Sequence, residues 1–192
     1  MWFRSKIKHN NKALRILLLT NGLILFAGAM LGPIYALFVE DVGGNLLDAS
    51  IAAAVFALAA GITVLVSGRL SDKTGKPRSV IAVGYVVVGT AFFLFTSVNS
   101  ITSLLLVQVL MGFGEAIYVP AFDSIYSQHL NKHKEASGWG LWEAMNYFIM
   151  TIAALTGGLI VTLANFDVLF VVMGLLAIGS AIFLYFLPKK TF

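Results

Sequence analysis

The sequence predicts an all-α membrane protein built from six transmembrane helices. Three observations support this fold class. The mean hydropathy is +0.90, 59% of the residues are hydrophobic against 11% that are charged, and the apolar residues come in blocks rather than on one face of each element. A soluble helical domain would need a polar residue at every third or fourth position of each helix, and the chain lacks them. Lipid is therefore the expected solvent for most of the chain.

Six apolar runs reach roughly 20 residues, the length that crosses a bilayer. They cover residues 13–39, 49–70, 79–98, 101–126, 138–163 and 166–187. Short connections containing Gly, Pro or Asn separate them, as expected for turns. We expect a basic cytoplasmic N-terminal segment over 1–12, the six-span bundle over 13–188 and a cytoplasmic C-terminal tail over 189–192. The first run is too long for the apolar part of a secretory signal, so we interpret it as a retained span.

All 13 Lys and Arg residues fall on one side of this topology. They are Arg4, Lys6, Lys8, Lys12, Arg15, Arg69, Lys73, Lys76, Arg78, Lys132, Lys134, Lys189 and Lys190. The connections on the other side carry only acids, namely Glu40, Asp41, Asp48 and Asp167. Because basic loops stay in the cytoplasm, both termini are predicted to be cytoplasmic, in a multi-pass protein of the plasma (inner) membrane.

The same composition argues against other classes of protein. The cations cluster at the ends of apolar runs and do not form the stripe with interleaved aromatic residues that binds nucleic acid. The chain has no cysteine, which rules out disulfides, thiolate metal sites and a cysteine nucleophile. His129 and His133 have a metal-ligand spacing but no third ligand nearby. Without a nucleophile–base pair, a metal site or a phosphate-binding loop, we expect no enzyme activity, no metal and no cofactor.

One segment between the second and third predicted spans has a distinctive pattern. It reads Gly68-Arg-Leu-Ser-Asp-Lys-Thr-Gly-Lys-Pro-Arg78 and resembles the signature of the major facilitator superfamily, Gly-x-Leu-Ser/Ala-Asp-Arg/Lys-x-Gly-Arg/Lys-Arg/Lys. The matching residues, in order, are Gly68, Leu70, Ser71, Asp72, Lys73, Gly75 and Lys76. Pro77 replaces the second base of the pattern, and Arg78 follows one place later. Gly112 and Gly114, followed by Pro120, resemble the family's fourth span more weakly.

The resemblance covers the whole chain but only half of the family's usual architecture. It implies a bundle of two inverted three-span repeats, one half of a carrier whose substrate binds between two such bundles. A single bundle cannot enclose that site. We therefore expect a parallel homodimer of half-carriers, which the one-sided charge distribution permits. The alternative is a fragment or a non-transporting membrane module that pairs with another half-carrier.

The resemblance also implies a role for the signature segment. In the family, its aspartate and bases are thought to lock the two bundles together on the cytoplasmic side in the outward-facing state. Carried over to this chain, the cytoplasmic gate would consist of Gly68, Arg69, Asp72, Lys73, Gly75, Lys76 and Arg78, with Asp123 from the fourth span. The glycines would permit a tight turn and close helix packing. The alternative, a loop that only fixes topology, explains neither the glycines nor Asp72.

Polar residues inside the predicted spans are candidates for a substrate or proton path. Glu115 lies about halfway across the fourth span, where an ionised acid costs at least ~2.5–3.5 kcal/mol, so it should face an aqueous cavity or be protonated. The fifth span carries a stripe of aromatic, acidic and amide residues at helical spacing. The candidates are Glu115, Glu143, Gln108, Asn146, Asn21 and Trp142. For Asn21 and Asn146, hydrogen bonding between helices is an equal alternative.

An acidic, aromatic-lined cavity favours cationic or proton-coupled traffic. Two departures from the family bear on this: Gln108 stands where proton-driven drug exporters have an arginine, and Ala153-Ala-Leu-Thr-Gly-Gly158 stands where they have Gly-Pro-x-x-Gly-Gly. Proton coupling would therefore have to rest on the acids alone. The sequence thus predicts secondary active transport of a small molecule by alternating access, with substrate, direction and coupling ion left open.

Overall fold

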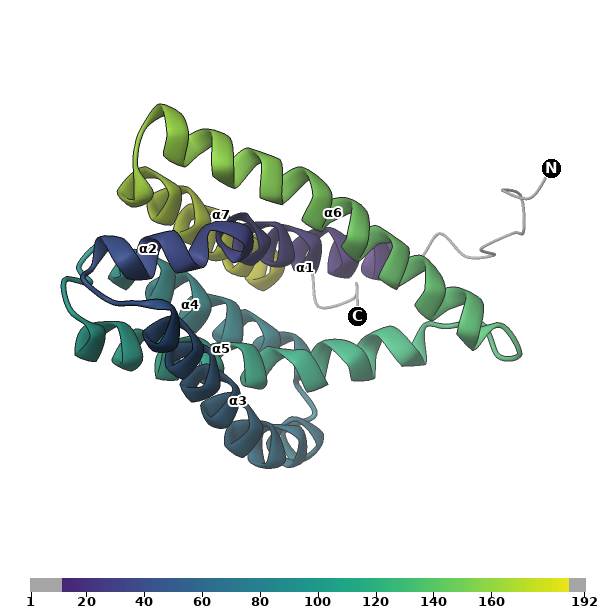
Figure 1. Cartoon of the computed structure of the whole chain (residues 1–192). Helices are drawn as coiled ribbons and strands as arrows, with labels where there is room; N and C mark the ends of the chain where they lie inside the picture. The colour runs from purple at the N-terminus through teal and green to yellow at the C-terminus, as the bar shows by residue number, and fades with distance from the viewer. Residues whose placement is uncertain (1–11, 187–192) are drawn as a thin grey trace.

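Helices form nearly all of the chain that the computed structural model describes, residues 12–186 (Figure 1). They are α1 (Lys12–Leu31), α2 (Tyr35–Asp41), α3 (Leu46–Thr74), α4 (Pro77–Phe95), α5 (Ile101–Gln128), α6 (Glu135–Leu163) and α7 (Phe166–Phe186), with a 3₁₀ turn, η1 (Gly32–Ile34), between α1 and α2. Six segments are long and apolar enough to cross a membrane, and the first combines α1, η1 and α2. The predicted six-span, all-helical fold is confirmed. Apart from Lys12, the predicted N-terminal segment lies outside the described residues, as does the C-terminal tail.

Polar residues extend the helices beyond the apolar runs. Asn45 Oδ1 accepts hydrogen bonds from the amide groups of Leu47 and Asp48, at 2.8 and 3.3 Å, and Asp48 Oδ2 accepts one from the Asn45 amide at 2.9 Å. This reciprocal cap satisfies N–H groups that the first turn leaves free. As a result α3 begins at Leu46 rather than at residue 49. At its other end Gly75, with φ of 57°, stops the helix in the left-handed conformation that glycine tolerates.

The second half of the bundle repeats the first. α5, α6 and α7 each begin 89 residues after their counterparts, at Ile101, Glu135 and Phe166 against Lys12, Leu46 and Pro77. The packing shows the same correspondence between the two halves. α3 packs on α5 as α6 packs on α1, and α4 packs on α5 as α7 packs on α1. α4 and α7, which are counterparts, pack on each other. This arrangement is consistent with the predicted 3+3 repeat.

The two ends of the bundle differ in charge. The α3–α4 and α5–α6 connections lie at one end, which we call the basic end. The connections 42–45, 96–100 and 164–165 lie at the other end, which we call the acidic end. At the acidic end, aromatic rings join α2, α4 and α7. The ring centroid of Phe170 lies 4.8 Å from that of Phe38 and 5.0 Å from that of Phe95. This contact closes the acidic end of the bundle between those three helices.

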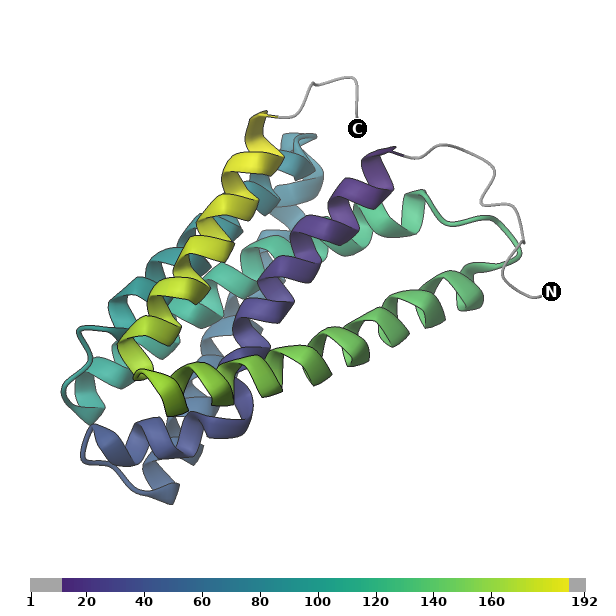
Figure 2. The same cartoon turned by 90° about the horizontal axis from the view of Figure 1, so that it is seen from above.

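The two flanking helices, α3 and α6, are the least buried spans, with 17% and 11% of their apolar windows buried. Each meets its inner neighbour at a glycine. A Cβ on Gly112 of α5 would lie 2.5 Å from the Phe56 carbonyl oxygen of α3, and one on Gly157 of α6 would overlap the Met30 carbonyl of α1. Figure 2 shows α6 crossing α1 near the acidic end and running apart from it toward the basic end.

Candidate functional site

A cavity of about 600 Å³ lies among α1, α3, α4, α5 and α6 and is partly open. Its volume falls within the ~300–1,000 Å³ usual for small-molecule sites. Its acidic and amide groups come from two helices, which also contribute aromatic and methionine side chains. These residues are Gln108, Met111, Glu115 and Tyr118 of α5 and Glu143, Asn146, Tyr147 and Met150 of α6. Both sets follow helical spacing, so one face of each helix forms the wall.

Two carboxylates, both candidates from the sequence, line this cavity. Glu115 of α5 is half-buried, and Glu143 of α6 is exposed. Among the described residues that line the cavity there is no Lys, Arg or His. A carboxylate at this depth needs water, a proton or a cation to offset its charge. The cavity wall can therefore hold a proton or attract a positively charged molecule.

Gln108 is buried at the edge of the cavity and fixes two elements to each other. Its Nε2 donates a hydrogen bond to the Tyr35 hydroxyl at 2.6 Å, which joins α5 to α2. Tyr35 also lines the cavity. Sequence reasoning did not select Tyr35, because its contact is with a residue 73 positions away, which spacing within one helix cannot reveal. Gln108 thus joins α5 to α2 through the Tyr35 hydroxyl.

Asn146 lines the cavity with an unsatisfied acceptor. Its side-chain oxygen Oδ1 is buried and accepts no hydrogen bond from the described residues. A buried amide oxygen without a donor is destabilising by roughly 1–3 kcal/mol. Asn146 therefore offers an acceptor for a hydrogen-bond donor that enters the cavity.

Two of the predicted path residues are not among those that line the cavity. Asn21 is buried in α1, where its Oδ1 accepts a hydrogen bond from the Tyr85 hydroxyl at 3.0 Å. Asn21 therefore joins α1 to α4, which is the helix-bonding alternative considered for it. Trp142 is also buried, and its ring packs against Phe122 at a centroid distance of 4.9 Å. Helical spacing alone could not separate the two faces of α6.

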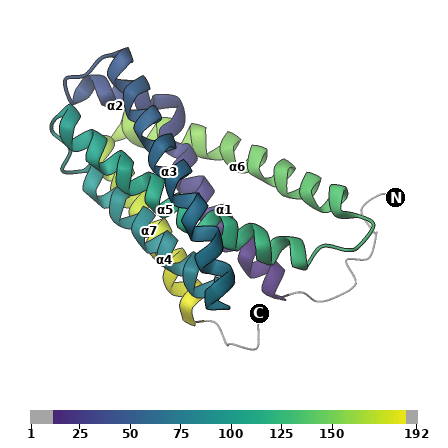
Figure 3. The same ribbon diagram turned by 90° about the horizontal axis from the view of Figure 1, so that it is seen from below.

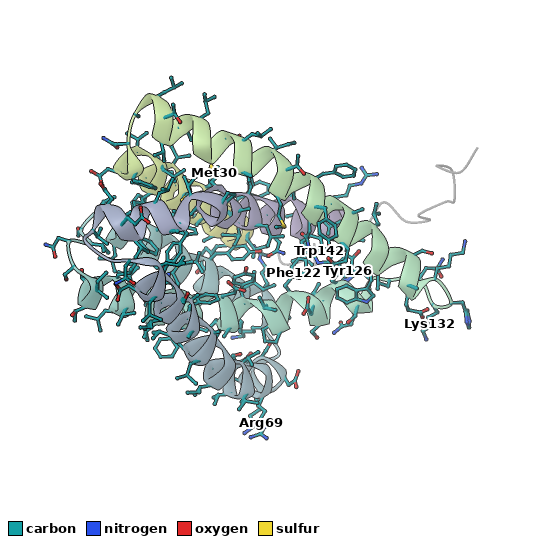
Figure 4. The ribbon with its side chains drawn as sticks, viewed as in Figure 1. Met30, Arg69, Phe122, Tyr126, Lys132 and Trp142 are labelled. Atoms are coloured by element: carbon teal, nitrogen blue, oxygen red, sulfur yellow. The ribbon has the colours of Figure 1, made fainter. Side chains whose placement is uncertain are left out.

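Trp142 belongs to an aromatic cluster that joins α5 and α6 on the basic side of the cavity. The cluster consists of Phe122, Tyr126, Trp139 and Trp142. Figure 4 shows Phe122, Tyr126 and Trp142 close together. Tyr126 and Trp139 have centroids 4.9 Å apart, and the Tyr126 hydroxyl donates a hydrogen bond to the Gly138 carbonyl at 2.6 Å. Phe122 and Trp139 each lie one helical turn nearer the basic end than the cavity residues Tyr118 and Glu143.

The signature segment spans the end of α3 and the start of α4. Asp72 and Lys73 are exposed in the last turn of α3, Gly75 ends that helix, and Lys76 precedes α4. Asp123 is half-buried in α5. Figure 4 shows Arg69 at the end of α3, pointing away from the bundle. Nothing in the described residues lies within 4 Å of a Cβ added at Gly68, so close packing inside this bundle does not explain that glycine.

Arg78 has a defined contact inside the bundle. Its Nε donates a hydrogen bond to the Leu184 carbonyl at 2.6 Å, and its Nη2 donates one to the Tyr185 carbonyl at 2.5 Å. These carbonyls belong to the last turn of α7, where the helix leaves its acceptors unsatisfied. Arg78 therefore joins the start of α4 to the end of α7, an interaction that the sequence pattern did not predict.

The geometry defines the class of protein: a six-span membrane bundle with an open, carboxylate-bearing cavity part-way through it. No group of three or more His, Cys, Asp or Glu residues that could hold a metal occurs between residues 12 and 186. Residues 17–191 match the sequence profile of the Major Facilitator Superfamily. The chain therefore belongs to this family of transporters, and its class is not enzymatic.

Curated bacterial proteins match the chain at low identity. The chain is 24% identical over 183 residues to the Quinolone resistance protein NorA of Staphylococcus aureus, covering 94% of this chain and 47% of that protein. It is 26% identical over 130 residues to the Proton-coupled antiporter flippase LtaA of Staphylococcus saprophyticus, covering 67% of this chain and 32% of that protein. The chain thus spans about half the length, or less, of the curated relatives it matches.

Proposed function

We propose that the chain is one bundle of a secondary active transporter that moves a small molecule by alternating access. The observation that carries this proposal is the partly open cavity of about 600 Å³, lined by two carboxylates. In the family fold the substrate site lies between two such bundles. The opening of the cavity is where the second bundle would close it.

The second bundle is a second copy of this chain, in a parallel homodimer. Support comes from the charge distribution. A parallel pair keeps all 13 Lys and Arg residues on one side of the membrane, as the positive-inside rule requires. We propose that this side is cytoplasmic and that the protein resides in the plasma membrane, with both termini in the cytoplasm.

The substrate is a small cation with apolar, aromatic character. The lining supports this, because Glu115 and Glu143 supply negative charge while Phe56, Phe92 and Tyr147 supply ring faces. Cations are attracted to both types of group. Gln108 and Asn146 are the amides that would orient the ligand, and the contacts of Asn21 and Trp142 give those two a supporting role.

Glu115 is the proposed proton-coupling group. One relative is named as a proton-coupled antiporter, and Glu115 is a half-buried acid in the cavity wall.

In proteoliposomes, we expect a pH gradient to drive uptake of tetraphenylphosphonium, a probe chosen for its charge and rings. Glu115→Gln should abolish the component driven by the pH gradient and leave flux down the probe's own gradient. Glu135→Gln, at the exposed start of α6, is the matched control. A tetraphenylphosphonium flux that does not depend on pH, in the parent and in Glu115→Gln alike, would exclude proton coupling.

The signature segment is the proposed cytoplasmic gate, which consists of Gly68, Arg69, Asp72, Lys73, Gly75, Lys76 and Arg78 with Asp123. Its support is the match to the family signature and the exposure of Asp72 at the end of α3. We expect Asp72→Asn to insert normally but to transport tetraphenylphosphonium more slowly, with a changed ratio of the two access states. Asp167→Asn, at the acidic end, serves as the control. Unchanged transport by Asp72→Asn would contradict the gate.

A second candidate is a non-transporting module or a fragment that pairs with another half-carrier, which the half-length match also permits. Since the chain has no cysteine, single cysteines can be placed at will. A cysteine at exposed Leu65 on α3 should crosslink to a second copy in native membranes if the homodimer is right, whereas one at exposed Ile182 on α7 should not. A crosslink from Leu65 to a different protein alone would favour the second candidate.

A further inference from the structure

The packing of α3 against α5 includes a buried polar contact outside the cavity. Ser67 Oγ of α3 donates a hydrogen bond of 2.5 Å to the backbone carbonyl of Ala116 in α5. Both residues are buried. Other hydroxyl groups on α3, such as those of Ser50 and Thr63, bond to carbonyls of their own helix. Ser67 therefore stands out as the hydroxyl of α3 that reaches across to another helix.

Pro120 explains why the Ala116 carbonyl needs this donor. In an α-helix each carbonyl accepts from the amide four residues later, so the normal donor to Ala116 would be residue 120. Pro120 lies inside α5 and has no N–H, and its ring presses on the carbonyl of the residue four positions earlier. A buried carbonyl without a donor is destabilising. The Ser67 hydroxyl replaces the hydrogen bond that Pro120 removes.

The contact lies between the two proposed functional regions. Ala116 directly follows Glu115 of the cavity wall, and Asp123 comes seven residues later, on the same side of α5. On the other helix, Ser67 directly precedes Gly68, the first residue of the signature segment. Movement of α3 along α5 at this contact would therefore alter the position of the signature segment relative to Glu115.

The hydroxyl of Ser67 has a second acceptor, which makes the contact reversible. The carbonyl of Val64, in the same helix, lies 3.4 Å from Ser67 Oγ, in position for a weaker bond. If α3 and α5 separate here, the serine can rotate to its own helix. The Ala116 carbonyl then depends on water entering from the neighbouring cavity. The two arrangements thus differ in the donor to the Ala116 carbonyl, which is the Ser67 hydroxyl in one and water in the other.

We propose that Ser67 is a positioning residue that links the signature segment to the cavity by completing the interrupted hydrogen bonding of α5. The inference rests on the proposed transport function for its consequence, but the contact itself can be tested without transport. Removing the hydroxyl favours the state in which α3 and α5 are apart at this level. Restoring the helix's own donor at position 120 makes the hydroxyl dispensable.

The test combines Ser67→Ala, Ser67→Thr, Pro120→Ala and the Ser67→Ala/Pro120→Ala double variant. Because the chain has no cysteine, spin labels can be attached to cysteines at exposed Thr74 of α3 and exposed Gln128 of α5. The distance between the labels is measured by pulsed electron paramagnetic resonance, with labelled protein diluted in unlabelled protein. Ser50→Ala, which removes an exposed hydroxyl that bonds within α3, is the control.

We expect Ser67→Ala to shift the ratio of short to long distances by about fivefold, the effect of one net hydrogen bond. Ser67→Thr should keep the parent ratio, and Ser67→Ala should have no further effect in the Pro120→Ala background. An unchanged ratio in Ser67→Ala, or an equal shift in both backgrounds, would overturn the proposal. Saturable tetraphenylphosphonium transport that slows in Ser67→Ala and recovers in the double variant would support it. If the distances shift as expected but the parent shows no transport, the positioning role holds and the proposed function fails.

Discussion

Gly68 of α3 and Gly157 of α6 occupy equivalent positions in the two halves of the bundle. They are separated by the same 89 residues that separate the starts of the paired helices. At Gly157 α6 lies tightly against α1, because an added Cβ would overlap the carbonyl of Met30. At Gly68 nothing in the described residues lies within 4 Å of an added Cβ. Equivalent glycines therefore have different neighbours in one bundle.

The difference follows from how each flanking helix is attached. α6 meets α1 at Gly157, near the acidic end, and meets α5 through the aromatic cluster nearer the basic end. α3 meets α5 at Gly112 and again through the hydrogen bond from Ser67 to Ala116. That bond attaches α3 one residue before Gly68, so the glycine faces away from α5. The surface at Gly68 is therefore available to the second bundle that we propose.

The largest expected effect comes from breaking the attachment of α6 to α5. Trp142→Ala removes a buried ring that packs on Phe122 and Tyr126. Loss of a buried aromatic side chain typically destabilises by about 3–5 kcal/mol, which should appear as a lower free energy of unfolding in a denaturing-detergent titration. Tyr147→Ala, which removes an exposed ring on the same helix, should change it by much less. Equal effects in the two variants would show that the aromatic cluster does not hold α6.

A smaller effect is expected at the crossing of α6 with α1. Gly157→Ala places a Cβ against the Met30 carbonyl, so the helices must separate or tilt. Overpacking of this kind costs typically 1–3 kcal/mol, measured in the same titration. Gly158→Ala is the matched control, because no atom of the described chain lies within 4 Å of its added Cβ. If the two alanine variants unfold alike, the crossing is not as close as the structure indicates.

These comparisons also show what the sequence could predict. Length and hydropathy were sufficient to predict the six spans, because only a few kinds of backbone structure can cross a bilayer. The charges were sufficient to predict which connections lie at the same end of the bundle. Helix ends were missed where polar residues such as Asn45 and Asp48 continue a helix past its apolar run. At the candidate site, the mid-span acid Glu115 and the spacing of Gln108 and Asn146 were sufficient to select residues that line the cavity.

Other features of the site depend on contacts between distant segments, which spacing within one helix cannot supply. Trp142 and Glu143 are adjacent in the sequence, yet one packs on α5 and the other lines the cavity. Arg78 matched the signature only approximately, and its contact with the last turn of α7 depends on a helix that begins 89 residues after Pro77. Pro120 was noted in the sequence, but the donor that compensates for it lies on α3.

The smallest expected effect on stability is at Gly68, and it sharpens the comparison most. Gly68→Ala should not lower the free energy of unfolding of the bundle, because no described atom lies within 4 Å of the new methyl group, and the better helix propensity of alanine should raise it by at most about 1 kcal/mol. If Gly68 packs against a second bundle, the same variant should weaken crosslinking between copies through a cysteine at Leu65 and slow transport. Gly61→Ala, another uncrowded position on α3, tests whether any methyl group on this helix has that effect. A Gly68→Ala variant with parent-like stability, crosslinking and transport would mean that the signature glycine has no close neighbour in either bundle.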